Sequence, residues 1–118
     1  MYRKLLKSKI HRAIVTDANL HYEGSLTVDK NLLDAAGIYE HELVQVVDID
    51  NGARLETYAI IGEAGSGEIK ANGAAARLIH PGDRVIIMTY AYVPDPMHAD
   101  WSPSIVLVND DNSIKESL

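Results

Sequence analysis

One stretch of the sequence restricts the possible folds more than any other: ELVQVVDID, followed by Asn51-Gly52 and then by ARLETYAIIG. Both flanking runs are rich in the residue types that favour β-strands. Asn and Gly tolerate positive φ angles at low cost, so the pair between the two runs fits a type I′ turn. The stretch therefore predicts a β-hairpin.

Later segments of the chain carry further strand and turn signals. Pro81 and Gly82 suit the central positions of a type II turn, and residues 85–93 after them are expected to form a strand. The segment SIVLVND, from Ser104, predicts another strand. The polar and charged tail NDDNSIKESL, residues 109–118, is expected to fray.

A short strand followed by a short helix is expected in LTVDKNLLDAAGI, directly after Ser25. Asp29 or Asn31 is the candidate N-cap of this helix, and Gly37 can end it in the left-handed conformation. Many short strands with one or two helical turns indicate a small β-barrel or sandwich. Because 118 residues without a linker or repeat suit one domain, a single domain is expected over residues 1–118.

Composition argues against several classes of function. Lys and Arg number 11 against 17 Asp and Glu, which gives a net charge of −6, and no segment concentrates basic residues. Nucleic acid is therefore not an expected partner, and a small DNA-binding β-fold is disfavoured. The absence of cysteine excludes disulfides, thiolate nucleophiles and cysteine-ligated zinc. With no signal-peptide pattern and no run of roughly 20 apolar residues, a cytoplasmic protein without membrane contact is expected.

Two common enzyme motifs are not met. The five histidines are scattered, without an HExxH motif or a nearby carboxylate group, so no metal site is predicted. The segment GEAGSG, residues 62–67, has the composition of a phosphate-binding loop but lacks the Gly-Lys-Ser/Thr ending. A tight hairpin connection is expected there instead.

The Gly24-Ser25 pair stands where an alternating apolar pattern should begin a strand. Most such pairs are exposed turns, so the dipeptide alone predicts no chemistry. In a strained turn, however, the Ser25 hydroxyl can attack the carbonyl carbon of Gly24, which has no side chain to block the approach. The resulting N→O acyl shift gives an ester, and β-elimination then cuts the chain and leaves dehydroalanine, which hydrolyses to a pyruvoyl group.

Five segments, in order along the chain, carry a resemblance to one family: KSKIHRAIVTDANLHYEGS, LLDAAGI, NGARLETYAI, GSG with NGAAAR, and HPGDRVII. They resemble the pyruvoyl-dependent aspartate 1-decarboxylases, which make β-alanine for the synthesis of pantothenate and hence coenzyme A. The resemblance implies a mainly β fold, a small six-stranded double-psi β-barrel with short helices. It also implies a homotetramer with active sites between subunits, and self-cleavage between Gly24 and Ser25.

The resemblance further implies the reaction. A pyruvoyl group made from Ser25 would be the covalent cofactor, without metal or pyridoxal phosphate, and would condense with the amine of L-aspartate to form an imine. Loss of the α-carboxylate as CO2 leaves a carbanion that this group stabilises as an electron sink. Tyr58 matches the family's proton donor, and a tyrosine hydroxyl with a pKa of about 10 can serve as that acid.

The family also supplies candidates for substrate binding. Arg54 suits the carboxylate that is retained, because a guanidinium binds carboxylates with two hydrogen bonds, and Lys9 adds positive charge. Thr57 projects to the face of an ideal strand opposite to Tyr58. The family nevertheless brings Thr57 into the site, partly across a subunit boundary, and implicates it in cleavage. The remaining candidates are a small-residue turn for substrate binding and two supporting residues: Asn72, Gly73, Ala74, Ala75, His11 and Tyr22.

Several alternatives stay open at this point. Leu26 and Val47 depart from residues found in some relatives, which leaves the pocket shape undetermined. Gly24-Ser25 can instead be a plain turn in a non-catalytic barrel that binds a ligand or partner. An imine on Lys9 is a further alternative to one on residue 25, and the sequence does not say whether a helper protein assists cleavage.

Overall fold

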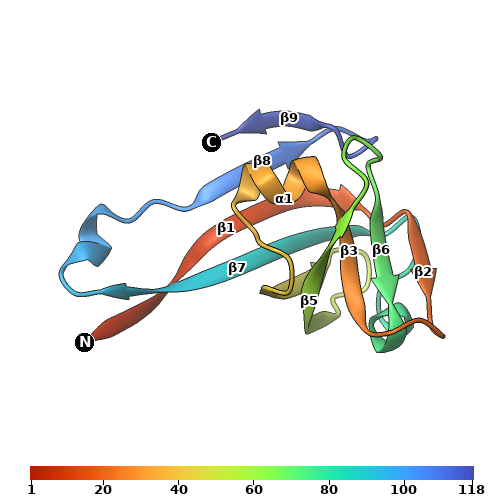
Figure 1. The fold of residues 1–118 in the computed structure, drawn as a ribbon, viewed down its shortest axis with the longest axis horizontal. Coiled ribbons are helices and arrows are strands. Elements are labelled where there is room, and N and C mark those ends of the chain that lie inside the picture. Colours follow the sequence, from red (N-terminus) through yellow and green to blue (C-terminus); the bar gives the residue numbers. More distant parts are fainter.

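The structure, a computed structural model, describes residues 1–118. Strands make up most of the molecule, and all nine belong to one hydrogen-bonded sheet that carries a short α-helix (Figure 1). The strands are β1 (Tyr2–Ile14), β2 (Asp17–Asn19), β3 (Ser25–Asp29), β4 (Leu43–Asp48), β5 (Arg54–Gly62), β6 (Ile69–Asn72), β7 (Arg84–Pro94), β8 (Ser104–Val108) and β9 (Ile114–Ser117). The helices are α1 (Lys30–Ala36) and the 3-10 helices η1 (Gly73–Arg77) and η2 (Met97–Asp100). None of the three meets the length and hydrophobicity that a transmembrane helix needs. The prediction of a mainly β fold with short helices is confirmed.

The strands follow the order β2-β6-β3-β5-β4-β7-β1-β8-β9 across the sheet. The resemblance predicts six strands, and the sheet has more because β2 at one end and β8 and β9 at the other extend a central set of six. The chain passes from β1, at one end of that central set, into β2, which pairs with β6 at the other end. Between them, the backbone N–H of Thr16 donates to the carbonyl oxygen of Ile69 at 2.8 Å. The β1–β2 segment thus contacts both ends of the central set.

The predicted hairpin is formed by β4 and β5, but its turn is not type I′. Gly52 has a φ of +76°, whereas Asn51 is not among the residues with positive φ. The Asp48 carboxylate accepts hydrogen bonds from the backbone N–H groups of Asp50 (2.8 Å) and Asn51 (3.3 Å). A side-chain acceptor therefore stabilises the turn, and only one residue needs the left-handed conformation.

Two local predictions are confirmed. At Pro81-Gly82, Gly82 has a φ of +91°, as the third position of a type II turn requires. The Asp29 carboxylate caps α1 by accepting a hydrogen bond from the N–H of Asn31 at 2.8 Å, and Gly37 ends the helix with a φ of +69°.

The glycine-rich loop at residues 63–68 does not close a hairpin, contrary to the prediction. It joins β5 to β6, but β3 lies between these strands, parallel to β5 and antiparallel to β6. The Asp29 carboxylate accepts hydrogen bonds from the N–H groups of Gly65 (3.0 Å) and Gly67 (2.8 Å). The carboxylate that caps α1 therefore also holds the loop at the end of β3.

The prediction that residues 109–118 fray is wrong. This segment turns back and forms β9, which pairs antiparallel with β8. Asn112, in the turn, is buried, and its side-chain amide donates to the carbonyl oxygens of Ile14 and Gly67, each at 2.8 Å. The side chains of β9 are all exposed, so backbone pairing and the Asn112 hydrogen bonds hold it without any apolar pattern.

The hydrophobic core is one cluster of 18 buried side chains, contributed mainly by the central strands and α1. Its largest members, such as Ile10, Leu26 and Ile87, are fully buried. Burying each such side chain contributes about 1.5–3 kcal/mol to folding. The core thereby fixes the strands that carry the candidate site.

Candidate active site

Ser25 begins β3 and is only 3% exposed. Asn72, the last residue of β6, lies directly opposite it in the antiparallel register. The Asn72 side-chain Nδ2 donates hydrogen bonds to Ser25 Oγ (2.8 Å) and Thr27 Oγ1 (2.9 Å). The Ser25 hydroxyl hydrogen is not used in this interaction, and the buried Asn72 Oδ1 has no hydrogen-bond partner. The site thus holds the hydroxyl oxygen in place while leaving its proton free to move.

The glycines on either side of this pair are also in contact. Gly24 precedes Ser25 and Gly73 follows Asn72, so the antiparallel register brings the two glycines together. Gly73 is buried, has a φ of +67°, and lies against the backbone of Gly24 and the carbonyl oxygen of Tyr22. The Gly24-Ser25 bond therefore lies next to the end of β6.

A cavity of about 190 Å³ adjoins this bond. It is lined by Gly24, Leu55, Glu56, Thr57, Asn72, Ala74, Ala75 and Leu78. Five predicted site residues are among them, from the loop before β3, from β5, from the end of β6 and from the turn after it. A larger cavity, of about 370 Å³, lies away from Ser25, between α1, the glycine-rich loop and the β8–β9 turn.

Tyr58 is not part of this cavity. The two residues before it, Glu56 and Thr57, line the cavity from opposite faces of β5. Tyr58 is 39% exposed, and its ring centroid lies 6.2 Å from that of His41. The parallel register of β3 and β5 pairs Leu26 with Ala59, so the residues before them, Ser25 and Tyr58, lie side by side on one face of the sheet within one chain.

Arg54 and Lys9 lie on the same outer face as Tyr58. Arg54 donates a hydrogen bond from Nη1 to Gln45 Oε1 at 3.0 Å. Gln45 is paired across the sheet with Met88, which is in turn paired with Lys9. Because paired residues in a sheet point to the same face, Lys9 and Arg54 share this face, and neither lines the cavity beside Ser25.

The two supporting residues also lie outside the cavity. His11 lines a separate depression of about 320 Å³ between the ends of β1 and β8. Burial, together with the positive charges of Lys9 and Arg12, holds the pKa of His11 below its usual value, so the neutral form is favoured near pH 7. The ring of Tyr22 is 57% exposed and carries the ammonium of Lys70 5.0 Å from its centroid.

Sequence reasoning missed Thr27, Leu55, Glu56 and Leu78. Thr27 accepts the second hydrogen bond of Asn72, and the other three line the cavity. Thr27 lies two residues after Ser25, so strand alternation contained a signal for it, because both must point to one face of β3. Leu55 lies two residues before Thr57, so the same alternation places both on one face of β5 and could have predicted Leu55.

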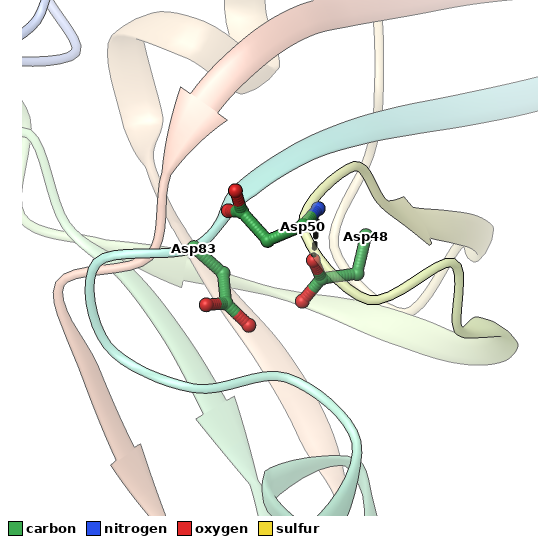
Figure 2. Close-up of side chains that lie close together, drawn as sticks. All are labelled: Asp48, Asp50 and Asp83. Carbon is green, nitrogen blue, oxygen red and sulfur yellow. Dashed lines mark hydrogen bonds between the residues drawn. The ribbon is translucent and has the colours of Figure 1, made fainter.

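A second polar cluster, outside this site, is formed by three aspartates. Asp48, Asp50 and Asp83 converge from the β4–β5 turn and from the segment before β7 (Figure 2). One carboxylate oxygen from each lies within 4.8 Å of the others. Burial and, next, a hydrogen bond with Asp83 raise the pKa of Asp48, and the same hydrogen bond lowers the pKa of Asp83. Of the two carboxyl groups, Asp48 is therefore the one that binds a proton more readily.

Comparison with known proteins places these residues in a family. Residues 1–115 match the family described as "Aspartate decarboxylase". A relative named aspartate 1-decarboxylase from Clostridium beijerinckii is 59% identical over 98% of this chain and 94% of its own. Relatives of the same name from Caldicellulosiruptor bescii and Bacillus thuringiensis are 57% and 52% identical, over 97% and 100% of this chain and 89% and 93% of their own. A computationally designed protein, msDPBB_sym2, aligns with a TM-score of 0.46 and 14% identity over 74% of this chain and 99% of its own. The chain belongs to the aspartate decarboxylase family.

Proposed function

We propose that this protein decarboxylates L-aspartate to β-alanine and CO2 after cutting its own chain between Gly24 and Ser25. Membership of the family supports the reaction. The observation that carries the cleavage is the buried Ser25 hydroxyl held by Asn72 beside the Gly24 peptide. The β-alanine would serve pantothenate and coenzyme A synthesis in the cytoplasm, a reducing compartment compatible with a chain that lacks cysteine.

Self-cleavage begins with Ser25 Oγ as the nucleophile. A bond forms between Oγ and the Gly24 carbonyl carbon, the peptide C–N bond breaks, and the hydroxyl proton passes to the nitrogen of Ser25. Asn72 orients Oγ without holding its proton. β-Elimination then removes a proton from the Ser25 α-carbon, breaks the Cβ–Oγ bond and releases a carboxylate on Gly24. Water hydrolyses the dehydroalanine that remains, which releases ammonia and leaves a ketone at the α-carbon.

The residues around Ser25 fit a pyruvoyl group made from that side chain. Gly24, Gly73 and Ala74 present little bulk, and Asn72 offers a buried donor that already reaches the Ser25 oxygen. The group would draw electrons from the carbon that loses CO2, which no unmodified side chain does. Because Ser25 Oγ leaves with the Gly24 carboxylate, this donor would then be free for the ketone oxygen, which comes from water.

The cavity beside Gly24 is the proposed substrate site. Thr57 contributes a hydroxyl, and Asn72 Oδ1 is an unpaired acceptor for the substrate amine. Backbone N–H groups at the turn of Gly73, Ala74 and Ala75 are suited to a carboxylate, because a left-handed residue next to helical ones directs successive N–H groups to one side.

Arg54 and Lys9 are proposed to act on the cavity of a neighbouring copy in a homotetramer, and Tyr58 is proposed to act beside Ser25 of its own chain. All three lie on the outer face of the sheet, where apolar side chains are also exposed, including Leu43 at 54%. In that arrangement Arg54 and Lys9 would bind a substrate carboxylate. Tyr58 would donate the proton that replaces CO2.

A product assay tests the proposal. Purified protein incubated with L-aspartate should release β-alanine and CO2 in equal amounts, while Ser25→Ala, which lacks the nucleophile, should release neither. Borohydride added with aspartate should attach the substrate to residue 25 of the fragment that begins there. Attachment to Lys9 instead, or activity in Ser25→Ala, would contradict the proposal, and a folded but inactive wild type would favour the non-catalytic barrel.

A further inference from the structure

We infer that Gly73 is a positioning residue for self-cleavage, in addition to its proposed place in the substrate site. The inference rests on the proposed function. It assigns to the backbone at residue 73 the task of holding the Gly24 carbonyl carbon within reach of the Ser25 hydroxyl. Asn72 and Gly73 would then hold the two reacting groups, the nucleophile and the electrophile, from two consecutive positions.

The contact between the two glycines is closer than any side chain allows. A Cβ on residue 73 would lie 2.8 Å from Gly24 Cα, 3.0 Å from Gly24 N and 3.0 Å from the carbonyl oxygen of Tyr22. Carbon atoms in van der Waals contact are about 3.5–4.0 Å apart, so residue 24 would have to move by several tenths of an ångström or more. All three contacted atoms belong to the backbone, which cannot rotate away as a side chain does.

Conformation alone does not explain this glycine. Gly37 has almost the same φ, +69° against +67°, yet a Cβ there would meet nothing within 4 Å. Gly67 has a φ of +72° and its Cβ would lie 2.6 Å from the carbonyl oxygen of Asp111, far along the chain from Ser25. These two glycines separate the effect of backbone strain from the effect of displacing Gly24.

Displacement of Gly24 acts directly on the reaction. The Oγ–carbon bond forms only when the hydroxyl approaches the carbonyl carbon closely, and a misplacement of about 1 Å costs on the order of 100-fold in rate. Asn72 anchors the hydroxyl of Ser25 by a 2.8 Å hydrogen bond, so a shift of Gly24 is not matched by a shift of Oγ. Substitution of Gly73 should therefore slow cleavage more than it lowers stability.

The test compares three alanine variants of the full chain. Gly73→Ala, Gly37→Ala and Gly67→Ala are purified as folded species by gel filtration, and the uncut fraction is followed by intact mass over time. We expect Gly73→Ala to be cut up to about 100-fold more slowly than wild type, and the other two to be cut at the wild-type rate. Thermal melting gives the structural readout, and we expect Gly67→Ala to lose at least as much stability as Gly73→Ala.

A second substitution tests the inference if Gly73→Ala does not fold. Asn tolerates positive φ better than Ala but carries the same Cβ, so Gly73→Asn keeps the clash with less strain, and Gly37→Asn is its control. Cleavage of either Gly73 variant at the rate of its control would overturn the inference and leave the proposed function intact. A wild type that never cuts would instead overturn the proposed function, and the inference with it.

Discussion

Asn72 joins the nucleophile, the cavity and the turn after β6 into one site. Replacing it by Ala removes the donor to Ser25 Oγ and Thr27 Oγ1. One hydrogen bond contributes about 0.5–1.5 kcal/mol, so we expect cleavage to slow by roughly 10-fold. Asn72→Asp is the matched control, because a carboxylate of nearly the same size accepts but does not donate. Intact mass over time should show both variants slowed, and rapid cleavage of Asn72→Asp would mean that Asn72 acts as an acceptor.

Substitution of Tyr58 should slow decarboxylation but not self-cleavage. No hydrogen bond joins Tyr58 to Ser25, whose Oγ is held by Asn72, so Tyr58→Phe should be cut at the wild-type rate. Loss of a general acid typically costs about 100- to 10,000-fold, and we expect kcat for β-alanine release to fall within that range. Rate measurements on the fully cut variant test this, and a kcat equal to that of wild type would assign the proton to another group.

Between β4 and β7, the carboxyl pair of Asp48 and Asp83 links stability to pH. The pKa of Asp48 is raised on folding, so the folded state binds this proton more tightly than the unfolded state does. The stability that results is fully present below the usual aspartate pKa and is lost as pH rises through the raised pKa. The lowered pKa of Asp83 acts in the opposite sense: its contribution is present above the usual aspartate pKa and is lost as pH falls through the lowered value. Between the usual aspartate pKa and the raised pKa of Asp48, stability should therefore fall with increasing pH.

Asp48→Asn tests this at the same two elements. The amide can donate to Asp83 without titrating, so we expect the fall in melting temperature between about pH 4 and pH 8 to become smaller than in wild type. Asp48→Ala instead leaves the N–H groups of Asp50 and Asn51 without an acceptor and should cost about 1–3 kcal/mol of unfolding free energy. Parallel pH profiles for wild type and Asp48→Asn would contradict a raised pKa at Asp48.

Elements whose signals are local were predictable, and elements held by distant partners were not. The Asp29 cap and Gly37 define α1 from within its own few residues, and the Asn51-Gly52 hairpin was found the same way. The turn type of that hairpin was missed because a side chain, Asp48, replaces a backbone conformation. β9 was missed because Asn112 contacts residues from β1 and the glycine-rich loop, and no local pattern reports such contacts.

For the whole molecule, the main prediction is that complete active sites need two copies of the chain. Ser25→Ala cannot be cut but keeps Arg54, and Arg54→Ala can be cut but lacks the guanidinium. If Arg54 acts on a neighbour, co-expressed copies of the two variants should regain activity, up to about one quarter of wild type for random assembly. A mixture no more active than its parents would mean that both residues act in the same chain.

The sharing of sites between copies of the chain also explains which site residues the sequence could identify. Ordered motifs identified Ser25, Thr57 and Asn72, and the fold brings these three to one place. The motifs also identified Arg54, but its partner in one chain is Gln45 on the outer face. A residue that completes a neighbour's site has no signature of that role in its own strand, because alternation reports only which face it occupies.

The mass of the intact wild-type protein tests the central claim most directly. A freshly purified sample should resolve into two fragments, residues 1–24 and residues 25–118, with a pyruvoyl group in place of the amino group on the second. Ser25→Ala, prepared in parallel, should give one mass. A wild-type sample that forms β-alanine from aspartate while remaining a single uncut chain would contradict the claim that Ser25 becomes the catalytic group.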